Sequence, residues 1–183
     1  MMKNFKLKKE DTLLLIIDIQ ERLVPAMFQG DKVINNNKIL ITALKEMNIP
    51  IIHTEQYPRG LGRTIADLSE ILGAEKPLEK IVFSAFNKEL KDVLIASGRI
   101  NILLTGMESH VCVYQTARDL IQNGFNVFLV SDGVTSRTKE NYQVGVNLIK
   151  DMGGIITSTE VALFDLLEAA GSDEFKMVSK LVK

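Results

Sequence analysis

The single cysteine of the sequence, Cys112, lies where a thiol could act as a nucleophile. It follows the apolar run Asn101–Thr105, which is typical of a strand buried on both faces. Apolar residues then recur at helical spacing, so we expect Cys112 in the first turn of a helix capped by Ser109 or His110. Free N–H groups and the helix dipole stabilise a thiolate there and could polarise a carbonyl oxygen. The same pattern also fits a small cysteine that merely fills the core.

Two charged residues, Asp18 and Lys80, lie beside other apolar runs. Asp18 directly follows Thr12–Ile17, and Lys80 directly precedes Ile81–Ser84. In open parallel sheets, ligands bind beyond the carboxyl ends of the strands, so we expect these side chains near Cys112. A carboxylate could accept the thiol proton, and a partly buried lysine could balance its charge. The residues alone also allow Asp18 to be a helix N-cap and Lys80 to be a surface lysine.

Neither a metal nor a cofactor is expected. His53 and His110 lack cysteine or glutamate partners at the spacing of known zinc motifs. His110 is close to Cys112 in the chain, but residues near each other in a first helical turn point in different directions, so we expect a structural or pocket-wall role. The stretch Arg59–Arg63 contains two glycines but lacks the fingerprint of a phosphate-binding loop.

The elements that must position these residues alternate between strand and helix. Further apolar runs of strand length are Ile49–Thr54, Asn126–Ser131 and Gly154–Thr157. Helical spacing is found over Asp31–Asn48, Lys88–Ser97, Ser109–Asn123, Lys139–Met152 and Thr159–Leu167, with a last short helix after Ser172. This alternation predicts an α/β fold: a three-layer αβα sandwich around a six-stranded, mostly parallel sheet. We expect one domain over residues 1–183.

The overall composition argues against some classes of partner. The chain has 22 basic and 23 acidic residues and a formal net charge of −1, so we expect neither nucleic acid nor a membrane surface as partner. The apolar run Leu13–Ile17 is too short for a signal sequence or a membrane span. One cysteine cannot form an intrachain disulfide, which favours a reducing compartment. We therefore expect a cytoplasmic protein with a small-molecule substrate.

A homo-oligomer is also expected. The mean hydropathy is +0.10, and the stretch Gln56–Pro77 has no strong periodicity. The C-terminal segment carries several apolar residues, namely Phe175, Met177, Val178, Leu181 and Val182. Such features are typical of surfaces that cover a neighbouring subunit.

Three motifs resemble those of the isochorismatase-like cysteine hydrolases. The segment Gly106–Ala117 (GMESHVCVYQTA) closely resembles the nucleophile motif of that superfamily. Ile17–Gln20 resembles its catalytic-aspartate motif, and Lys80 with Phe83–Phe86 resembles its lysine motif. The likeness covers about residues 11–167, with the motifs in the right order at strand ends, and the loop after Thr54 resembles an uncharacterised subgroup.

The resemblance implies a Rossmann-like isochorismatase-type fold and a catalytic triad. Cys112 would attack an acyl carbon, Asp18 would serve as the base, and Lys80 would stabilise the charges of both. It further implies a cis peptide bond between Met107 and Glu108. That bond would turn the Glu108 N–H toward the substrate, where it would form an oxyanion hole with the Cys112 N–H.

Departures from the family patterns narrow the expected reaction. Nicotinamidases with a metal carry an aspartate and a histidine where this chain has Gln56 and Pro58, so a zinc-assisted nicotinamidase is not expected. True isochorismatases lack the cysteine, so its presence favours covalent catalysis. We expect hydrolysis of a small amide or related acyl substrate, at C–N bonds other than peptide bonds, as in the related N-carbamoylsarcosine amidohydrolases. The side chains expected to line the substrate pocket are Gln20, Phe28, Tyr57, Phe83 and Phe86.

Other functions stay open at this point. A family member could act on a C–O or C–N bond without a lasting thioester. A protein with the same fold could also be a non-catalytic, oligomeric binding protein. A redox-sensing thiol is less favoured, because the chain has no second cysteine to resolve an oxidised one.

Overall fold

The computed structural model describes residues 5–183, which fold around a six-stranded, all-parallel sheet. The strand order is β3-β2-β1-β4-β5-β6. The strands are β1 (Thr12–Ile17), β2 (Ile51–Gln56), β3 (Leu78–Lys80), β4 (Asn101–Met107), β5 (Asn126–Thr135) and β6 (Ile155–Thr157). The parallel sheet confirms the predicted α/β class.

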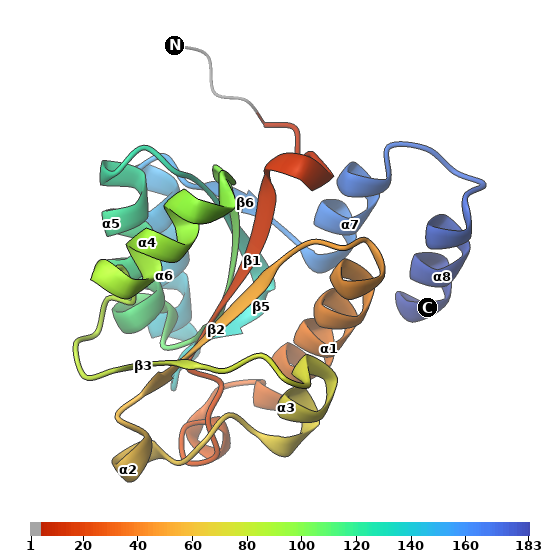
Figure 1. Ribbon diagram of the computed structural model, residues 1–183. Helices are drawn as coiled ribbons and strands as arrows, with labels where there is room; N and C mark the ends of the chain where they lie inside the picture. Colours follow the sequence, from red (N-terminus) through yellow and green to blue (C-terminus); the bar gives the residue numbers. More distant parts are fainter. Residues whose placement is uncertain (1–4) are drawn as a thin grey trace.

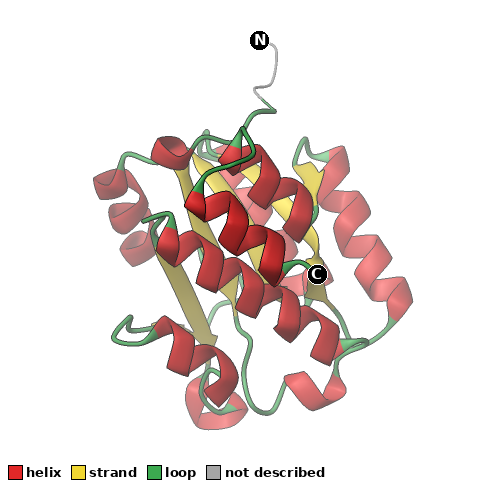
Figure 2. Ribbon diagram, turned by 90° about the vertical axis from the view of Figure 1, so that its right-hand side faces the viewer, coloured by secondary structure: helices red, strands yellow, loops and turns green. Residues whose placement is uncertain are grey.

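Helices cover both faces of this sheet (Figure 1). One layer contains α1 (Gly30–Glu46), α3 (Ala66–Leu72), α7 (Thr159–Leu167) and α8 (Asp173–Leu181). The other contains α4 (Lys88–Ser97), α5 (Tyr114–Gln122) and α6 (Lys139–Asp151), and the short α2 (Pro58–Leu61) follows β2. Figure 2 shows the first layer lying across the sheet. The three-layer sandwich is therefore present, with strand and helix alternating along the chain.

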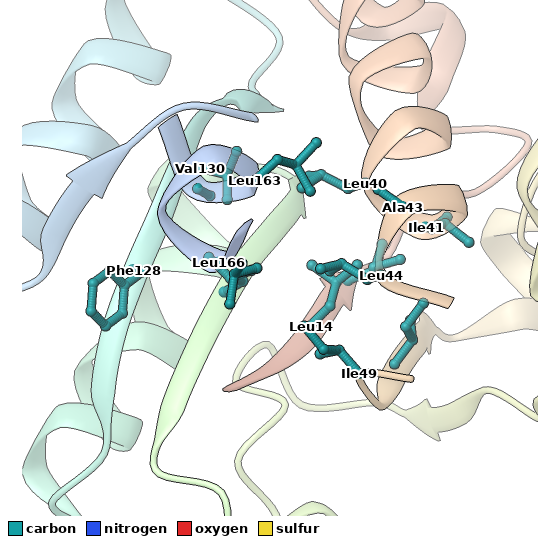
Figure 3. Packing of buried hydrophobic residues seen from close by; sticks show 14 of the residues in the cluster. Leu14, Leu40, Ile41, Ala43, Leu44, Ile49, Phe128, Val130, Leu163 and Leu166 are labelled. Atoms are coloured by element: carbon teal, nitrogen blue, oxygen red, sulfur yellow. The ribbon is translucent and has the colours of Figure 1, made fainter. Parts of the chain in front are cut away.

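The central strands are apolar throughout because both of their faces are covered. Every residue of β1 is buried, and successive side chains point into opposite layers. Leu14 and Ile16 belong to the core beneath α1 and α7, whereas Leu13 and Leu15 belong to the core beneath α4, α5 and α6. Figure 3 shows Leu14 among the side chains of the first core.

The third strand does not lie at Ile81–Ser84, the apolar run where we expected it. Strand β3 ends at Lys80, and the apolar residues after it lie on the surface, where Ile81 is 79% exposed. Because β3 is an edge strand and only three residues long, the chain leaves the sheet before this apolar run. The prediction from hydrophobicity alone therefore placed this strand too far toward the C-terminus.

The helix expected from Ser109 begins at that residue, but its first turn has π-helical rather than α-helical geometry. Residues Ser109–Val113 form a turn of π-helix, and α5 begins at Tyr114. Glu108 precedes the turn with a φ of 61°, and neither Ser109 nor His110 caps the turn. Cys112 thus lies inside an irregular turn between β4 and α5. We call residues 108–112 the nucleophile turn, after the predicted role of Cys112.

The C-terminal segment packs on its own chain. Helix α8 contacts α1 and α7, Val178 is fully buried, and the ring of Phe175 lies edge-on to that of Phe164 at 6.1 Å between centroids. Most of the apolar side chains of this segment are thus at least partly buried within the chain itself, and a contact with a neighbouring subunit stays a prediction. Within residues 5–183, no helix has both the length and the apolar character needed to cross a membrane.

Candidate active site

The Asp18 carboxylate is completely buried at the carboxyl end of β1. Its Oδ1 accepts a hydrogen bond from Thr54 Oγ1 at 2.6 Å, and its Oδ2 lies 2.6 Å from Lys80 Nζ. Lys80 comes from β3, two strands away from β1, so its side chain crosses the end of β2. Nζ also donates to Gln56 Oε1 at 2.7 Å and to the Phe83 carbonyl oxygen at 3.1 Å. A buried charge pair with this many partners is held in one geometry.

Cys112 faces this pair from the nucleophile turn. The side chain is 6% exposed, and burial is the main reason that the pKa of the thiol rises to about 12. The Asp18 charge and its action as a hydrogen-bond acceptor raise this pKa further, Glu108 adds to the rise, and Lys80 opposes it. Cys112 is therefore a protonated thiol at neutral pH. The expectation of a thiolate stabilised by the turn's N–H groups is wrong, because desolvation outweighs them.

A threonine of α5 holds the nucleophile turn in place. Thr116 Oγ1 donates to the Cys112 carbonyl oxygen at 2.7 Å and accepts from the Ala85 N–H at 2.9 Å, which links α5 to the loop after β3.

Beside Asp18, β1 and β4 approach closely where Gly106 pairs with Ile17. Gly106 has a φ of 128°, and a Cβ there would lie 2.1 Å from the Ile17 carbonyl oxygen. Only glycine fits this position, so it permits the close approach of the strands that carry Asp18 and Cys112.

The peptide bond between Met107 and Glu108 is trans, and no cis bond occurs in residues 5–183. The expected cis bond is therefore wrong. The chain reverses through the left-handed conformation of Glu108 instead, and the Glu108 carbonyl oxygen accepts from the N–H groups of Val111 (2.8 Å) and Val113 (3.3 Å). These bonds close the nucleophile turn.

Three of the five expected pocket residues lie elsewhere. Gln20 is fully buried, and its amide binds the backbone of Gln56 and Gly62, with both N–H groups and the oxygen engaged. Phe86 packs edge-on to Phe125 at the start of β5, with 6.0 Å between ring centroids. Phe28 lines a separate cavity of about 130 Å³ between α1, β5 and α6. Gln20 thus supports the loops, and Phe86 is partly buried against the edge of the core.

Tyr57 and Phe83 lie closer to Lys80. Tyr57 and Lys80 line a common cleft of about 430 Å³, to which Arg59 and Ile81 also contribute. The side chains of Tyr57 and Phe83 are both exposed, and the Phe83 carbonyl oxygen binds Lys80 Nζ. These two aromatic side chains lie at the open edge of the sheet, beside the buried charge pair.

Several residues at the site were not expected from the sequence. Thr54 and Gln56 bind the charged pair directly, and both are polar residues at the end of an apolar strand, a signal that could have identified them. Glu108 was expected to contribute its N–H, but its carboxylate forms an ion pair with Arg137. Nothing in the local sequence marks that contact. His110 Nδ1 lies 3.0 Å from Ser136 Oγ, in keeping with a structural role.

No three His, Cys, Asp or Glu side chains within residues 5–183 are grouped so that they could hold a metal ion. At one of the two positions compared with nicotinamidases, the Gln56 amide oxygen is bound to Lys80 Nζ. The expectation of a reaction without metal or cofactor stays a prediction.

Comparison with known proteins identifies the class to which this fold and site belong. The isochorismatase domain profile matches residues 12–161. The secreted isochorismatase effector Isc1 of Phytophthora sojae is 37% identical over 97% of this chain and 87% of its own length. The chain therefore belongs to the isochorismatase family and has the fold of its hydrolases.

Two solved structures show how far the similarity extends. The MAR1 ribonuclease of Caenorhabditis elegans is 33% identical, with a TM-score of 0.91 over 97% of this chain and 92% of that one. The YcaC gene product of Escherichia coli, described as an octameric hydrolase of unknown specificity, has a TM-score of 0.90 over 99% and 92% of the two chains. Because YcaC is only 20% identical, it supports the fold alone.

Proposed function

We propose that this protein hydrolyses a small amide or related acyl substrate through a thioester on Cys112, with Asp18 and Lys80 completing a catalytic triad. The observation that carries the proposal is the buried Asp18–Lys80 pair beside the one thiol of the chain. A buried carboxylate next to a protonated thiol can accept its proton over a short path. The hydrolase fold of the family supports the same reaction class.

The raised pKa of Cys112 suggests how the first step occurs. Since the thiol is protonated at neutral pH, its proton moves to Asp18 as Sγ attacks the carbonyl carbon. The N–H of Cys112 would hold the resulting oxyanion. The expected contribution of the Glu108 N–H depended on a cis bond before it, and that bond is trans. Asp18 returns the proton to the leaving nitrogen, the C–N bond breaks, and a thioester remains.

Water completes the proposed cycle. Asp18 takes a proton from the water as its oxygen attacks the thioester carbon, the C–S bond breaks, and the sulfur regains a proton from Asp18. An acid is released, and the enzyme returns to its starting state. The Lys80 amino group lies 2.6 Å from Asp18, where it would limit the cost of moving negative charge between the carboxylate and the sulfur.

The surface around the cleft supports the proposal of a homo-oligomer. The side chains of Ile81, Val82 and Phe83 follow one another at the sheet edge, and all are exposed. Consecutive exposed apolar residues are typical of surfaces that another chain covers. A second subunit at this edge would narrow the cleft beside Tyr57 and shield the reaction from water. YcaC, with a similar fold, is described as octameric.

The test is a panel of small amides, carbamates and ureas, assayed by ammonia release, with intact-protein mass spectrometry to detect acylated Cys112. We expect turnover by the wild-type protein, an acyl adduct at early times, and neither with Cys112→Ser. Turnover that survives in Cys112→Ser would indicate a reaction without a thioester. Specific binding without turnover in the wild type would indicate a binding protein. Either result would overturn the proposal.

The ribonuclease name of the Caenorhabditis elegans relative makes RNA cleavage a second candidate. The net charge of −1 argues against it, because affinity for RNA depends strongly on positive charge along the phosphate backbone. Incubation with a labelled RNA tests it, and cleavage lost in Cys112→Ser would favour this candidate over amide hydrolysis. The expected cytoplasmic location also stays a prediction, since the Phytophthora sojae relative is named as secreted.

A further inference from the structure

The nucleophile turn is held by the segment that joins β5 to α6. Residues 136–145 comprise the whole of this connection and the first half of α6 (Lys139–Asp151), and the turn and α6 are in extensive contact. Three different contacts join the two segments: an ion pair, a hydroxyl pair and a close backbone approach. None of the residues that supply them from the β5–α6 side belongs to the proposed triad.

The ion pair joins Arg137 to Glu108. The guanidinium donates from Nε to Oε1 at 3.2 Å and from Nη2 to Oε2 at 2.9 Å, a two-pronged geometry that fixes direction as well as distance. The Glu108 side chain is only 8% exposed, whereas that of Arg137 is 64% exposed. The exposed Arg137 side chain therefore holds the buried Glu108 carboxylate from the surface of the protein.

The other two contacts hold the residue after Glu108. Ser109 Oγ lies 2.6 Å from Ser136 Oγ, and both side chains are buried. Gly145 of α6 lies so close to the backbone of the turn that a Cβ on it would be 2.4 Å from the Ser109 carbonyl carbon. Glu108 itself has a φ of 61°, a left-handed conformation that is unfavourable for a residue with a Cβ. External contacts must keep it in that conformation.

We propose that Arg137 is a positioning residue for Cys112: through its ion pair with Glu108 it holds the nucleophile turn and balances the carboxylate charge beside the thiol. This inference rests on the proposed role of Cys112 as the nucleophile. The charged groups with the largest effect on the pKa of the thiol are Asp18, Lys80 and Glu108. Asp18 has Lys80 as counter-charge, and Arg137 fills the same role for Glu108.

The pairing matters because the Glu108 charge opposes ionisation of Cys112. Glu108 is among the causes of the raised pKa of the thiol. Without Arg137, the carboxylate would face the thiol with its charge less balanced, and the sulfur would lose its proton less readily. A purely structural clamp would have no such effect on thiol reactivity.

The chain offers a matched control in Arg63. Its guanidinium also pairs with a buried glutamate, Glu55, at 2.9 Å, and the exposed fractions of the two side chains are 63% and 3%. It binds the exposed Glu79 at 2.6 Å as well. Neither glutamate is among the groups with the largest effect on the pKa of Cys112. Arg63→Met therefore removes a guanidinium that is paired with a buried glutamate while leaving those groups unchanged.

The experiment measures the rate at which iodoacetamide labels Cys112 between pH 7 and 10. In this range the rate follows the thiolate fraction, so a raised pKa slows it at every pH. We expect Arg137→Met to be labelled about fivefold more slowly than wild type, because the Glu108 carboxylate loses its counter-charge and raises the pKa of the thiol further. Arg63→Met should stay within about twofold of wild type.

A second substitution distinguishes charge from structure. Adding Glu108→Gln to Arg137→Met removes the unbalanced carboxylate, so we expect the double variant to return to within about twofold of Glu108→Gln alone. Labelling that is unchanged or faster in Arg137→Met, equal slowing in Arg63→Met, or no rescue in the double variant would overturn the inference. Urea unfolding at pH 7 measures how much stability each variant loses.

Failure of this inference and failure of the proposed function give different results. Thiol labelling requires no substrate, so it tests the action of Arg137 on Cys112 directly. If the wild type releases no ammonia from any substrate but the labelling pattern is as expected, only the proposed hydrolysis is wrong. If turnover depends on Cys112 while Arg137→Met labels normally, only the role of Arg137 is wrong.

Discussion

Replacing Lys80 with methionine should strongly destabilise the protein. The side chains of Lys80 and Asp18 are 2% and 0% exposed, and methionine has similar length but no charge. Loss of Nζ leaves the Asp18 carboxylate with only the Thr54 hydroxyl and the Cys112 thiol, and Gln56 Oε1 loses its donor as well. Removing one member of a buried ion pair costs about 3–5 kcal/mol. Because the Thr54 hydrogen bond remains, we expect about 3 kcal/mol.

Urea unfolding measures this loss. With a slope of about 2 kcal/mol per molar urea for a chain of this size, the midpoint should fall by about 1.5 M. Lys38→Met is the control, because Lys38 pairs with Asp67 at 3.0 Å while both side chains are well exposed. Exposed pairs of this kind contribute about 0–1 kcal/mol.

Restoring charge balance should recover stability without activity. In the double variant Asp18→Asn/Lys80→Met the buried charge is gone, and asparagine tolerates the φ of 52° at this position. We expect it to regain at least half of the loss and to remain inactive. If Lys80→Met costs no more than Lys38→Met, or if the double variant is less stable than Lys80→Met, the buried pair does not have the energetics described above.

Three further outcomes are expected. The pKa of Cys112 is about 12 in the folded protein against an ordinary 9.0, so the folded state keeps a proton that the unfolded state releases above pH 9. Between pH 7 and pH 10, the free energy of unfolding of the wild type should therefore fall by about 1.4 kcal/mol relative to that of Cys112→Ser, as measured by urea unfolding. A difference in stability between the two proteins that is the same at both pH values would contradict this. Ile81→Asp should dissociate the oligomer in light scattering, and a wild type that is already a 20.4 kDa monomer would disprove the oligomer. Gly145→Ala should cost about 2 kcal/mol, since its Cβ would meet the Ser109 backbone, and a loss below about 0.5 kcal/mol in urea would contradict the close packing.

The sequence determined the layers of the fold and the elements near its centre. Strand β1 and helix α4 have the bounds expected from Thr12–Ile17 and Lys88–Ser97, because apolar periodicity reports burial directly. Elements at the edge were less well predicted. The apolar residues from Ile81 to Phe83 lie on the surface, and an exposed apolar run has the same sequence pattern as a buried strand.

The candidate triad shows the same division. Residue type and position at strand ends made Asp18, Lys80 and Cys112 candidates, since parallel strands bring their carboxyl ends to one edge. The resemblance to the isochorismatase-like hydrolases was needed to group them as a predicted triad. The sequence did not determine the ionisation of Cys112. A first helical turn lowers the pKa of a thiol, burial raises it, and the balance depends on how completely the side chain is desolvated.

Tertiary structure alone decided which distant residues support the site. Arg137 is 29 positions from Glu108 in the chain, and Gly145 reaches the Ser109 backbone from another helix. Phe86 resembled a pocket residue, but its ring packs on Phe125. Local sequence patterns record which faces are buried, but not which residues meet there, because those contacts depend on how helices and loops pack across the sheet.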